Sequence, residues 1–155
     1  MRFTRNGVLT GSAAIVITAG FSVGLESAAT AAALYAKTGT HVSHSYVFSS
    51  GNSGNMRCWG QTTDIPDAEM CYRADRNATY VQSTKANGYF KLGQHGSGGN
   101  TWRCRNNYTS SAGTGTWVEC KWSTKPGSAD CSTIRVGHGQ SDWYVLSRAS
   151  SLMCF

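Results

Sequence analysis

The sequence predicts an all-β fold, a small disulfide-stabilised β-sandwich or barrel built from short antiparallel hairpins. Short runs of β-branched and aromatic residues alternate with Gly, Asn and Ser clusters at close spacing. No window of about 12 residues shows a helical period of apolar residues. Six cysteines follow an N-terminal segment that resembles an export signal, and an even set of cysteines in an exported chain is typical of a disulfide framework.

The N-terminal segment has the parts of a secretory signal peptide. Arg2 and Arg5 form a positive region, an uncharged stretch of apolar and small residues follows, and a run of small residues ends at Ala33. We expect residues 1–33 to be the signal peptide and residues 34–155 to be a single secreted, β-rich domain. A membrane anchor is the alternative, but Thr, Ser and Gly dilute a stretch that would need about 20 strongly apolar residues. The sequence therefore predicts an extracellular protein with no transmembrane span after cleavage.

The first part of the predicted domain carries the weakest signals. Residues 34–44 have the composition of a flexible lead-in, and Ser45–Phe48 is a candidate strand. Residues 49–55 are a polar loop. The segment from Asp64 to Glu69, with Pro66 and three acidic residues, is typical of one helical turn, because Pro and acidic side chains favour a first turn. A calcium site formed by these carboxylates is the alternative, but the segment does not match the EF-hand loop.

The next predicted element is a hairpin over residues 79–92. Asn87-Gly88 is the favoured dipeptide for a two-residue turn of type I′. Strand alternation would then place Val81, Phe90 and Leu92 on the core face.

A second hairpin is predicted from Thr101 to Trp122. A register that sets Cys104 opposite Cys120 puts the alternate residues of both strands on one buried face, namely Trp102, Cys104, Val118, Cys120 and Trp122. The other face carries Arg103, Arg105, Trp117, Glu119 and Lys121. A disulfide between directly opposed strand positions is geometrically demanding, so the two cysteines could instead join different strands from the same buried face.

A third hairpin is predicted to join residues 133–136 to residues 143–146. For the six cysteines 15 pairings are possible, and we expect those between neighbours in the sequence: Cys58–Cys71, Cys104–Cys120 and Cys131–Cys154. No C-x-x-C motif is present, and the spacings fit no zinc pattern, so no metal site and no cofactor are predicted.

The net charge favours anionic partners. The formal charge is +6 for the chain and falls to +5 after the predicted cleavage, which gives a modest attraction to acidic glycans, cell-wall polymers or membrane surfaces. No feature indicates specific recognition of a nucleic acid, and the oligomeric state is open.

The leading functional hypothesis is a non-enzymatic protein that binds an extracellular surface or polymer, such as a glycan or cell wall. Arg103, Arg105, Trp117 and Lys121 are the candidate binding residues, because an exposed aromatic ring beside basic groups suits such ligands. The alternative for this face is that a further layer covers it.

Two other functions stay open at this point. A secreted toxin or antimicrobial protein would be served by the same charge and disulfides. A small hydrolase or ribonuclease could use His95 and His138, which lie in Gly-rich segments predicted to be loops, as a general acid and base. No motif supports that chemistry, and we expect no catalytic residue.

Overall fold

The protein has ten β-strands and one short helix among the residues that its structure, a computed structural model, describes. These are residues 32–49, 56–110, 113–123, 131–141 and 143–154. The elements in chain order are β1 (Leu34–Thr38), β2 (Thr40–Val42), α1 (His44–Phe48), β3 (Met56–Gly60), β4 (Ala68–Arg73), β5 (Ala78–Ser83), β6 (Phe90–Ser97), β7 (Asn100–Asn106), β8 (Trp117–Lys121), β9 (Thr133–Gln140) and β10 (Trp143–Leu146). The predicted all-β class, with disulfides, is confirmed.

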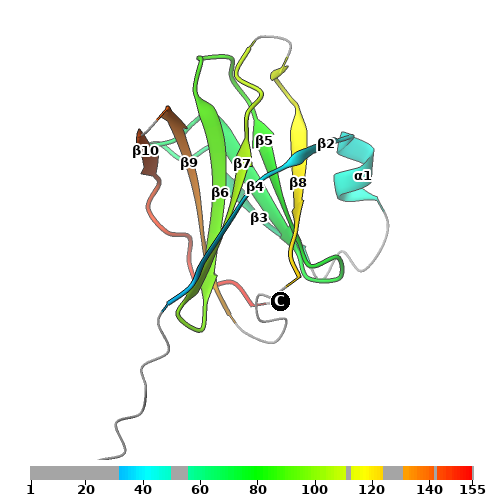
Figure 1. Cartoon of the computed structure of the whole chain (residues 1–155), viewed down its shortest axis with the longest axis vertical. Helices are drawn as coiled ribbons and strands as arrows, with labels where there is room; N and C mark the ends of the chain where they lie inside the picture. The colour runs from blue at the N-terminus through cyan, green and yellow to red at the C-terminus, as the bar shows by residue number, and fades with distance from the viewer. Residues whose placement is uncertain (1–31, 50–55, 111–112, 124–130, 142, 155) are drawn as a thin grey trace, which may run out of the picture. The chain divides into compact units, whose positions relative to one another are not determined.

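The strands form two five-stranded sheets that face each other (Figure 1). Sheet A has the order β1-β7-β6-β9-β10, and sheet B has the order β2-β8-β5-β4-β3. All neighbouring strands are antiparallel except β1 and β7, which are parallel. Both sheets bury an inner face, which explains why apolar and polar residues alternate along most strands.

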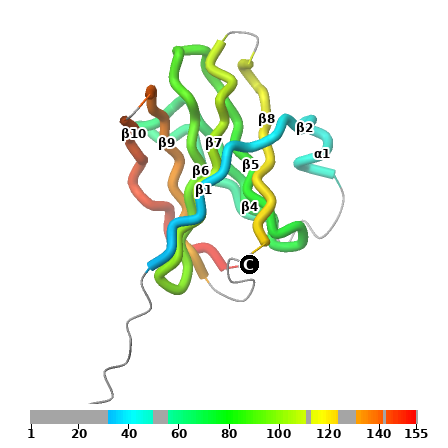
Figure 2. The backbone as a smooth tube through the Cα atoms, in the orientation of Figure 1, coloured from blue at the N-terminus to red at the C-terminus, as the bar shows by residue number. Residues whose placement is uncertain are grey.

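One edge of the sandwich is closed by the chain crossing from sheet A to sheet B. β1 ends at Thr38 on β7, and β2 begins at Thr40 on β8, so the crossing occurs at Gly39 (Figure 2). A side chain at residue 39 would meet the side chain of Val118 at 2.6 Å, which is too close for a real contact. Glycine therefore lets the chain change sheets without a gap. Residues 34–42, predicted to be a flexible lead-in, are instead strands of both sheets.

The core lies between the sheets and contains the residues predicted for the buried face of residues 101–122. Trp102, Cys104, Val118, Cys120 and Trp122 are all buried in one cluster. All three disulfides follow the predicted pairings, Cys58–Cys71, Cys104–Cys120 and Cys131–Cys154.

The hairpin predicted from Thr101 to Trp122 is wrong. β7 pairs with β1 and β6 in sheet A, and β8 pairs with β2 and β5 in sheet B. The Cys104–Cys120 bridge therefore joins the two sheets through the core, with 5.7 Å between the Cα atoms. The alternation was read correctly, but the two strands use it to face each other across the core rather than to lie side by side.

The hairpin predicted over residues 79–92 is also wrong, since β5 belongs to sheet B and β6 to sheet A. Val81 lies in the core, but Phe90 and Leu92 lie on the outer side of sheet A and Lys91 points inward. The predicted pairing near the C-terminus is confirmed as a β9–β10 hairpin, although its strand pairs are residues 137–140 with residues 143–146.

Two short segments also differ from prediction. Residues 45–48 belong to α1, whose first turn is capped by the Ser43 hydroxyl accepting the backbone N–H of Tyr46. The segment from Asp64 to Glu69 forms turns and then enters β4. The predicted loop at residues 50–55 lies outside the described residues. Within the described part of the chain, none of the helical segments has the length and apolarity that a membrane crossing requires.

Candidate functional site

A groove of about 280 Å³ lies on the outer face of sheet A. One side comes from β1, the floor from β6 and β7, and the far side from β10 and the turn before it. Its lining residues are Ala36, Lys37, Thr38, Phe90, Leu92, Arg103, Arg105, Ser141 and Tyr144. Since β1 and β10 are the two edges of the described sheet, the groove spans the sheet from edge to edge.

Two arginines dominate the chemistry of the groove. The guanidinium of Arg105 lies 3.7 Å from the centre of the Phe90 ring, and that of Arg103 lies 4.5 Å from the centre of the Tyr144 ring. Arg103 donates two hydrogen bonds to the side-chain oxygen of Gln94. Stacking on a ring holds a guanidinium in a fixed plane while leaving its charge and remaining N–H groups available.

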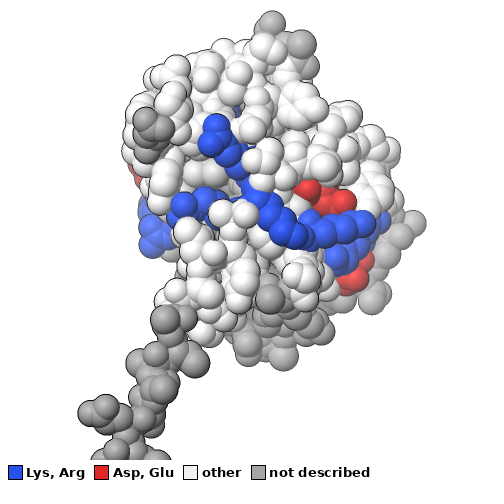
Figure 3. All heavy atoms as spheres, viewed as in Figure 1, with Lys and Arg blue, Asp and Glu red and all other residues white. Residues whose placement is uncertain are grey.

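The groove carries positive charge, and none of the described residues that line it is acidic. Arg105 donates to the side-chain oxygen of Asn107, another neutral acceptor, and among the described residues no ion pair involves Arg103 or Arg105. Lys and Arg side chains form a band across the face of the molecule that β1 crosses, with acidic side chains mainly at its right-hand end (Figure 3). The arrangement attracts anions, because an anionic group would be the first partner that neutralises these two charges.

β10 can form the far side of the groove because β9 has glycines at the positions that β10 packs against. A side chain at residue 139 would lie 2.2 Å from the carbonyl oxygen of Trp143 and 2.6 Å from the ring of Phe90. Residue 139 faces the outer side of the sheet, so the backbone of β10 occupies the space above it. Glycine lets β10 fold toward the outer face and bring Tyr144 onto Arg103.

The structure brings together only two of the four predicted binding residues. Arg103 and Arg105 share the groove, whereas Trp117 and Lys121 lie on the outer side of sheet B. Trp117 is 1% exposed and packs edge-to-face on Phe48 of α1, so the expectation of an exposed ring is wrong. Lys121 is exposed and lies 3.7 Å from the carboxylate of Glu119. The four residues do not share a face, because β7 and β8 are in different sheets.

A buried polar cluster lies between the sheets, at the end of the core next to the β9–β10 turn. Asp67 and Lys91 have side chains that are 2% and 0% exposed, with 3.1 Å between the charged atoms. The ammonium of Lys91 also donates to the side-chain oxygen of Asn87 and the backbone oxygen of Tyr89, which accounts for its three protons. Nδ1 of His138 lies 2.8 and 2.9 Å from the two carboxylate oxygens of Asp67.

The charge state of Asp67 follows from these contacts. Burial by itself would raise its pKa, but the hydrogen bonds from His138, Asn87 and Lys91 outweigh burial and hold the pKa of this carboxyl below 3.8. The ionised carboxylate only accepts hydrogen bonds, so the proton between the two side chains is on Nδ1 of His138. Nε2, the other ring nitrogen of His138, is left for a partner outside the cluster.

The two histidines of the hydrolase hypothesis are not brought together. Both lie in strands rather than loops, His95 in β6 and His138 in β9. His95 is opposite Ile134 in the sheet, four residues along β9 from His138, which corresponds to about 13 Å. His95 is 1% exposed between the rings of Tyr72 and Trp102, and burial lowers its pKa to about 3. A buried neutral imidazole at that distance does not form an acid–base pair with His138.

Sequence reasoning missed the residues that support both features. Phe90 and Tyr144, the rings under the arginines, were not assigned to a site, and Asp67, Asn87 and Lys91 were not assigned to a common cluster. One signal was present: a lysine between two apolar residues in a predicted strand leaves open which side faces the core. The burial of Lys91 depended on a partner 24 residues earlier in the chain, which no local pattern shows.

Comparison with known proteins gives no indication of the function, so the proposal depends on the geometry of the site. No protein-family model matches the chain, and neither the curated proteins nor the solved structures contain a match.

Proposed function

We propose that the protein is a secreted, non-enzymatic binding protein that holds an anionic extracellular polymer in the groove on the outer face of sheet A. One observation carries the proposal: two guanidinium groups are stacked on aromatic rings and bonded to neutral amide oxygens, in a groove whose described lining residues include no acidic side chain. A cell-wall or matrix glycan with carboxylate or sulfate groups is the intended class of ligand.

The spacing of the two arginines suits a polymer better than a single small anion. They are two residues apart on one strand, so their Cα atoms are about 7 Å apart along β7. Each guanidinium stacks on a different ring, which keeps the two charges separate. A polymer with repeated anionic groups would meet both at once, and linked weak contacts give a tighter complex than either alone.

The three disulfides support the extracellular part of the proposal. Disulfides persist in oxidising compartments and are rare in the cytosol. Every described cysteine is paired, which the oxidising conditions outside the cell favour.

The proposal is tested by replacing both arginines, as Arg103→Gln with Arg105→Gln. The probes are polygalacturonate, alginate, hyaluronan and sodium polyphosphate, with dextran as the neutral polymer. We expect at least one polyanion to bind, dextran not to bind, and the double variant to lose at least about 10-fold in affinity by calorimetry. Binding should also weaken as salt is raised, because the contacts are ionic.

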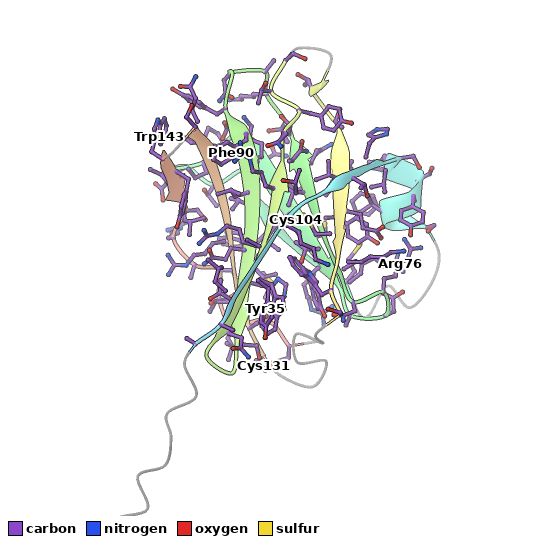
Figure 4. All side chains as sticks on the ribbon, in the orientation of Figure 1. Tyr35, Arg76, Phe90, Cys104, Cys131 and Trp143 are labelled. Carbon is purple, nitrogen blue, oxygen red and sulfur yellow. A yellow bond between two sulfur atoms is a disulfide. The ribbon has the colours of Figure 1, made fainter. Side chains whose placement is uncertain are left out.

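The matched control removes two positive charges elsewhere, as Arg76→Gln with Lys121→Gln. Both residues lie on the sheet B side, Arg76 next to α1 (Figure 4). The control should keep its affinity within about 2-fold. The proposal is contradicted if no polyanion binds, or if the control loses as much affinity as the groove variant, since attraction would then depend on net charge alone.

A further inference from the structure

The buried cluster of Asp67, Lys91 and His138 leaves one polar atom facing the outside. The side chain of His138 is 18% exposed, and its Nδ1 is engaged by Asp67. Nε2 has no hydrogen-bond partner among the described residues, yet it is not one of the buried unpartnered atoms, so it reaches solvent. The structure thus presents a ring nitrogen whose direction is fixed by a buried carboxylate, which is itself fixed by Lys91.

Two aromatic rings lie near this nitrogen. The ring of Tyr89 lies 5.1 Å from that of His138, and the ring of Trp143 lies 5.4 Å from Tyr89 and 6.5 Å from His138. Trp143 is 46% exposed and projects at the free edge of sheet A (Figure 4). An exposed indole beside an oriented ring nitrogen matches a sugar residue, which has an apolar face of C–H groups and hydroxyl groups that both donate and accept hydrogen bonds.

This ring cluster is continuous with the groove through β10. Trp143 and Tyr144 are consecutive residues of one strand, so they point to opposite sides of it. Tyr144 lines the groove and Trp143 contacts Tyr89 on the other side. A polymer that leaves the groove over the edge of β10 would therefore reach the ring cluster.

We infer that the bound polymer is a polysaccharide, and that Trp143, Tyr89 and Nε2 of His138 form a subsite for one of its sugar residues. The inference rests on the proposed function and names its ligand class. The subsite disfavours a polymer of phosphate groups, because a phosphate chain has no apolar face of C–H groups for the Trp143 ring and would approach the carboxylate of Asp67. The groove takes the acidic groups of the chain, and the subsite takes a ring and a hydroxyl.

The experiment compares sugar and non-sugar polyanions on three proteins. Wild type, Trp143→Ala and the control Leu152→Ala, an exposed apolar residue outside β10, are titrated with polygalacturonate, alginate, hyaluronan and polyphosphate at equal charge concentration. We expect wild type to prefer at least one polysaccharide over polyphosphate by about 10-fold, and Trp143→Ala to lose that preference while its affinity for polyphosphate is unchanged. Trp143→Phe should restore part of it, and Leu152→Ala should behave as wild type.

A second measurement reports on the ring nitrogen of His138 directly. The ¹⁵N resonance of His138 Nε2 should shift when the preferred polysaccharide is added and should stay in place with polyphosphate. The inference is overturned if polyphosphate binds as tightly as every polysaccharide, or if Trp143→Ala leaves the preference intact. In either case, the proposed function stands if the double variant Arg103→Gln with Arg105→Gln still loses affinity for the polyanions. If that variant binds all four polymers as wild type does, both the proposed function and this inference are contradicted.

Discussion

Two ionisable groups in the core are accommodated in opposite ways. Lys91 stays charged because three acceptors satisfy its ammonium and the Asp67 carboxylate balances its charge. Among the described residues, the ring of His95 has one side-chain hydrogen-bond partner, the hydroxyl of Thr79, and no carboxylate partner, so burial keeps it neutral and lowers its pKa to about 3. A buried charge needs a partner, whereas a histidine can avoid the cost by losing its proton.

Because of His95, the free energy of unfolding should therefore decrease as the pH is lowered. In the unfolded chain this histidine binds a proton near pH 6.5, but in the folded protein only near pH 3. The free energy of unfolding should be fully retained above pH 6.5 and fall by up to about 1.4 kcal/mol per pH unit between these values. Urea unfolding from pH 7 to pH 4.5 measures the slope, which should be smaller in His95→Gln.

A measurement on the wild-type protein tests the same prediction if the variant folds poorly. At pH 5, the NMR resonances of the wild-type His95 ring should be those of a neutral imidazole. A protonated His95 in the folded protein at pH 5 would contradict the assignment. Asp67 acts in a lower range, since its depressed pKa contributes stability that is lost below pH 3.8.

At the scale of elements, the strands from β5 to β10 were predictable, but of their pairings only that of β9 with β10 was. Alternation in β7 and β8 correctly separated the buried from the outward residues, because side chains of a strand point to alternate sides. The same rule applied to β6 chose the wrong side, since Phe90 and Leu92 are more apolar than Lys91. The choice was decided by Asp67 and by the guanidinium of Arg105, which lies on the outward ring of Phe90.

The groove depends on the glycine of β9 that lies below β10. Gly139→Ala should push β10 away, because the added methyl group would overlap the Trp143 carbonyl and the Phe90 ring. We expect the free energy of unfolding to fall by about 1–3 kcal/mol and the affinity for the polyanion to fall with it, since Tyr144 leaves Arg103. Urea unfolding and calorimetry measure the two effects.

Gly96→Ala in β6 is the matched control for this variant. The added methyl group there would have its nearest contact at 3.4 Å, so it needs only a small adjustment. Stability and affinity close to wild type are expected. Equal losses in both variants would show that any alanine in sheet A has this effect, and that the packing of β10 is not special.

For the whole molecule, the two sheets are held together by three kinds of link. The chain crosses at Gly39 between β1 and β2, the disulfide Cys104–Cys120 passes through the core, and Asp67 from the start of β4 bonds to side chains of sheet A. The other two disulfides bind neighbouring segments, β3 to β4 and residue 131 to the C-terminal segment.

Removing the central disulfide should destabilise the protein more than removing the C-terminal one. The loops span 16 residues for Cys104–Cys120 and 23 for Cys131–Cys154. Chain entropy alone gives about 3 kcal/mol for either, slightly more for the longer loop. Cys104 and Cys120 are also buried between the sheets, so their replacement by alanine leaves space in the core. Thermal unfolding of both double variants measures the difference, and a larger loss for Cys131→Ala with Cys154→Ala would contradict it.

The sequence by itself determined the features that depend on local patterns. The fold class follows from β-branched and aromatic runs between turn residues. The buried set from Trp102 to Trp122 follows from alternation alone. These properties depend on neighbours within a few residues, so a single chain is enough to derive them. The disulfide pairing was one expectation among 15 possible pairings, and the structure decided it.

Only the tertiary structure decided which strands are neighbours, and with that it decided the site. Arg103 and Arg105 were found because they share a strand, whereas Phe90 and Tyr144 join them through strand pairing that no local pattern encodes. Trp117 was lost from the site because its strand entered the other sheet and α1 covered it. Alternation assigns a residue to one of two faces, but the face becomes a surface or a core only when another element packs against it.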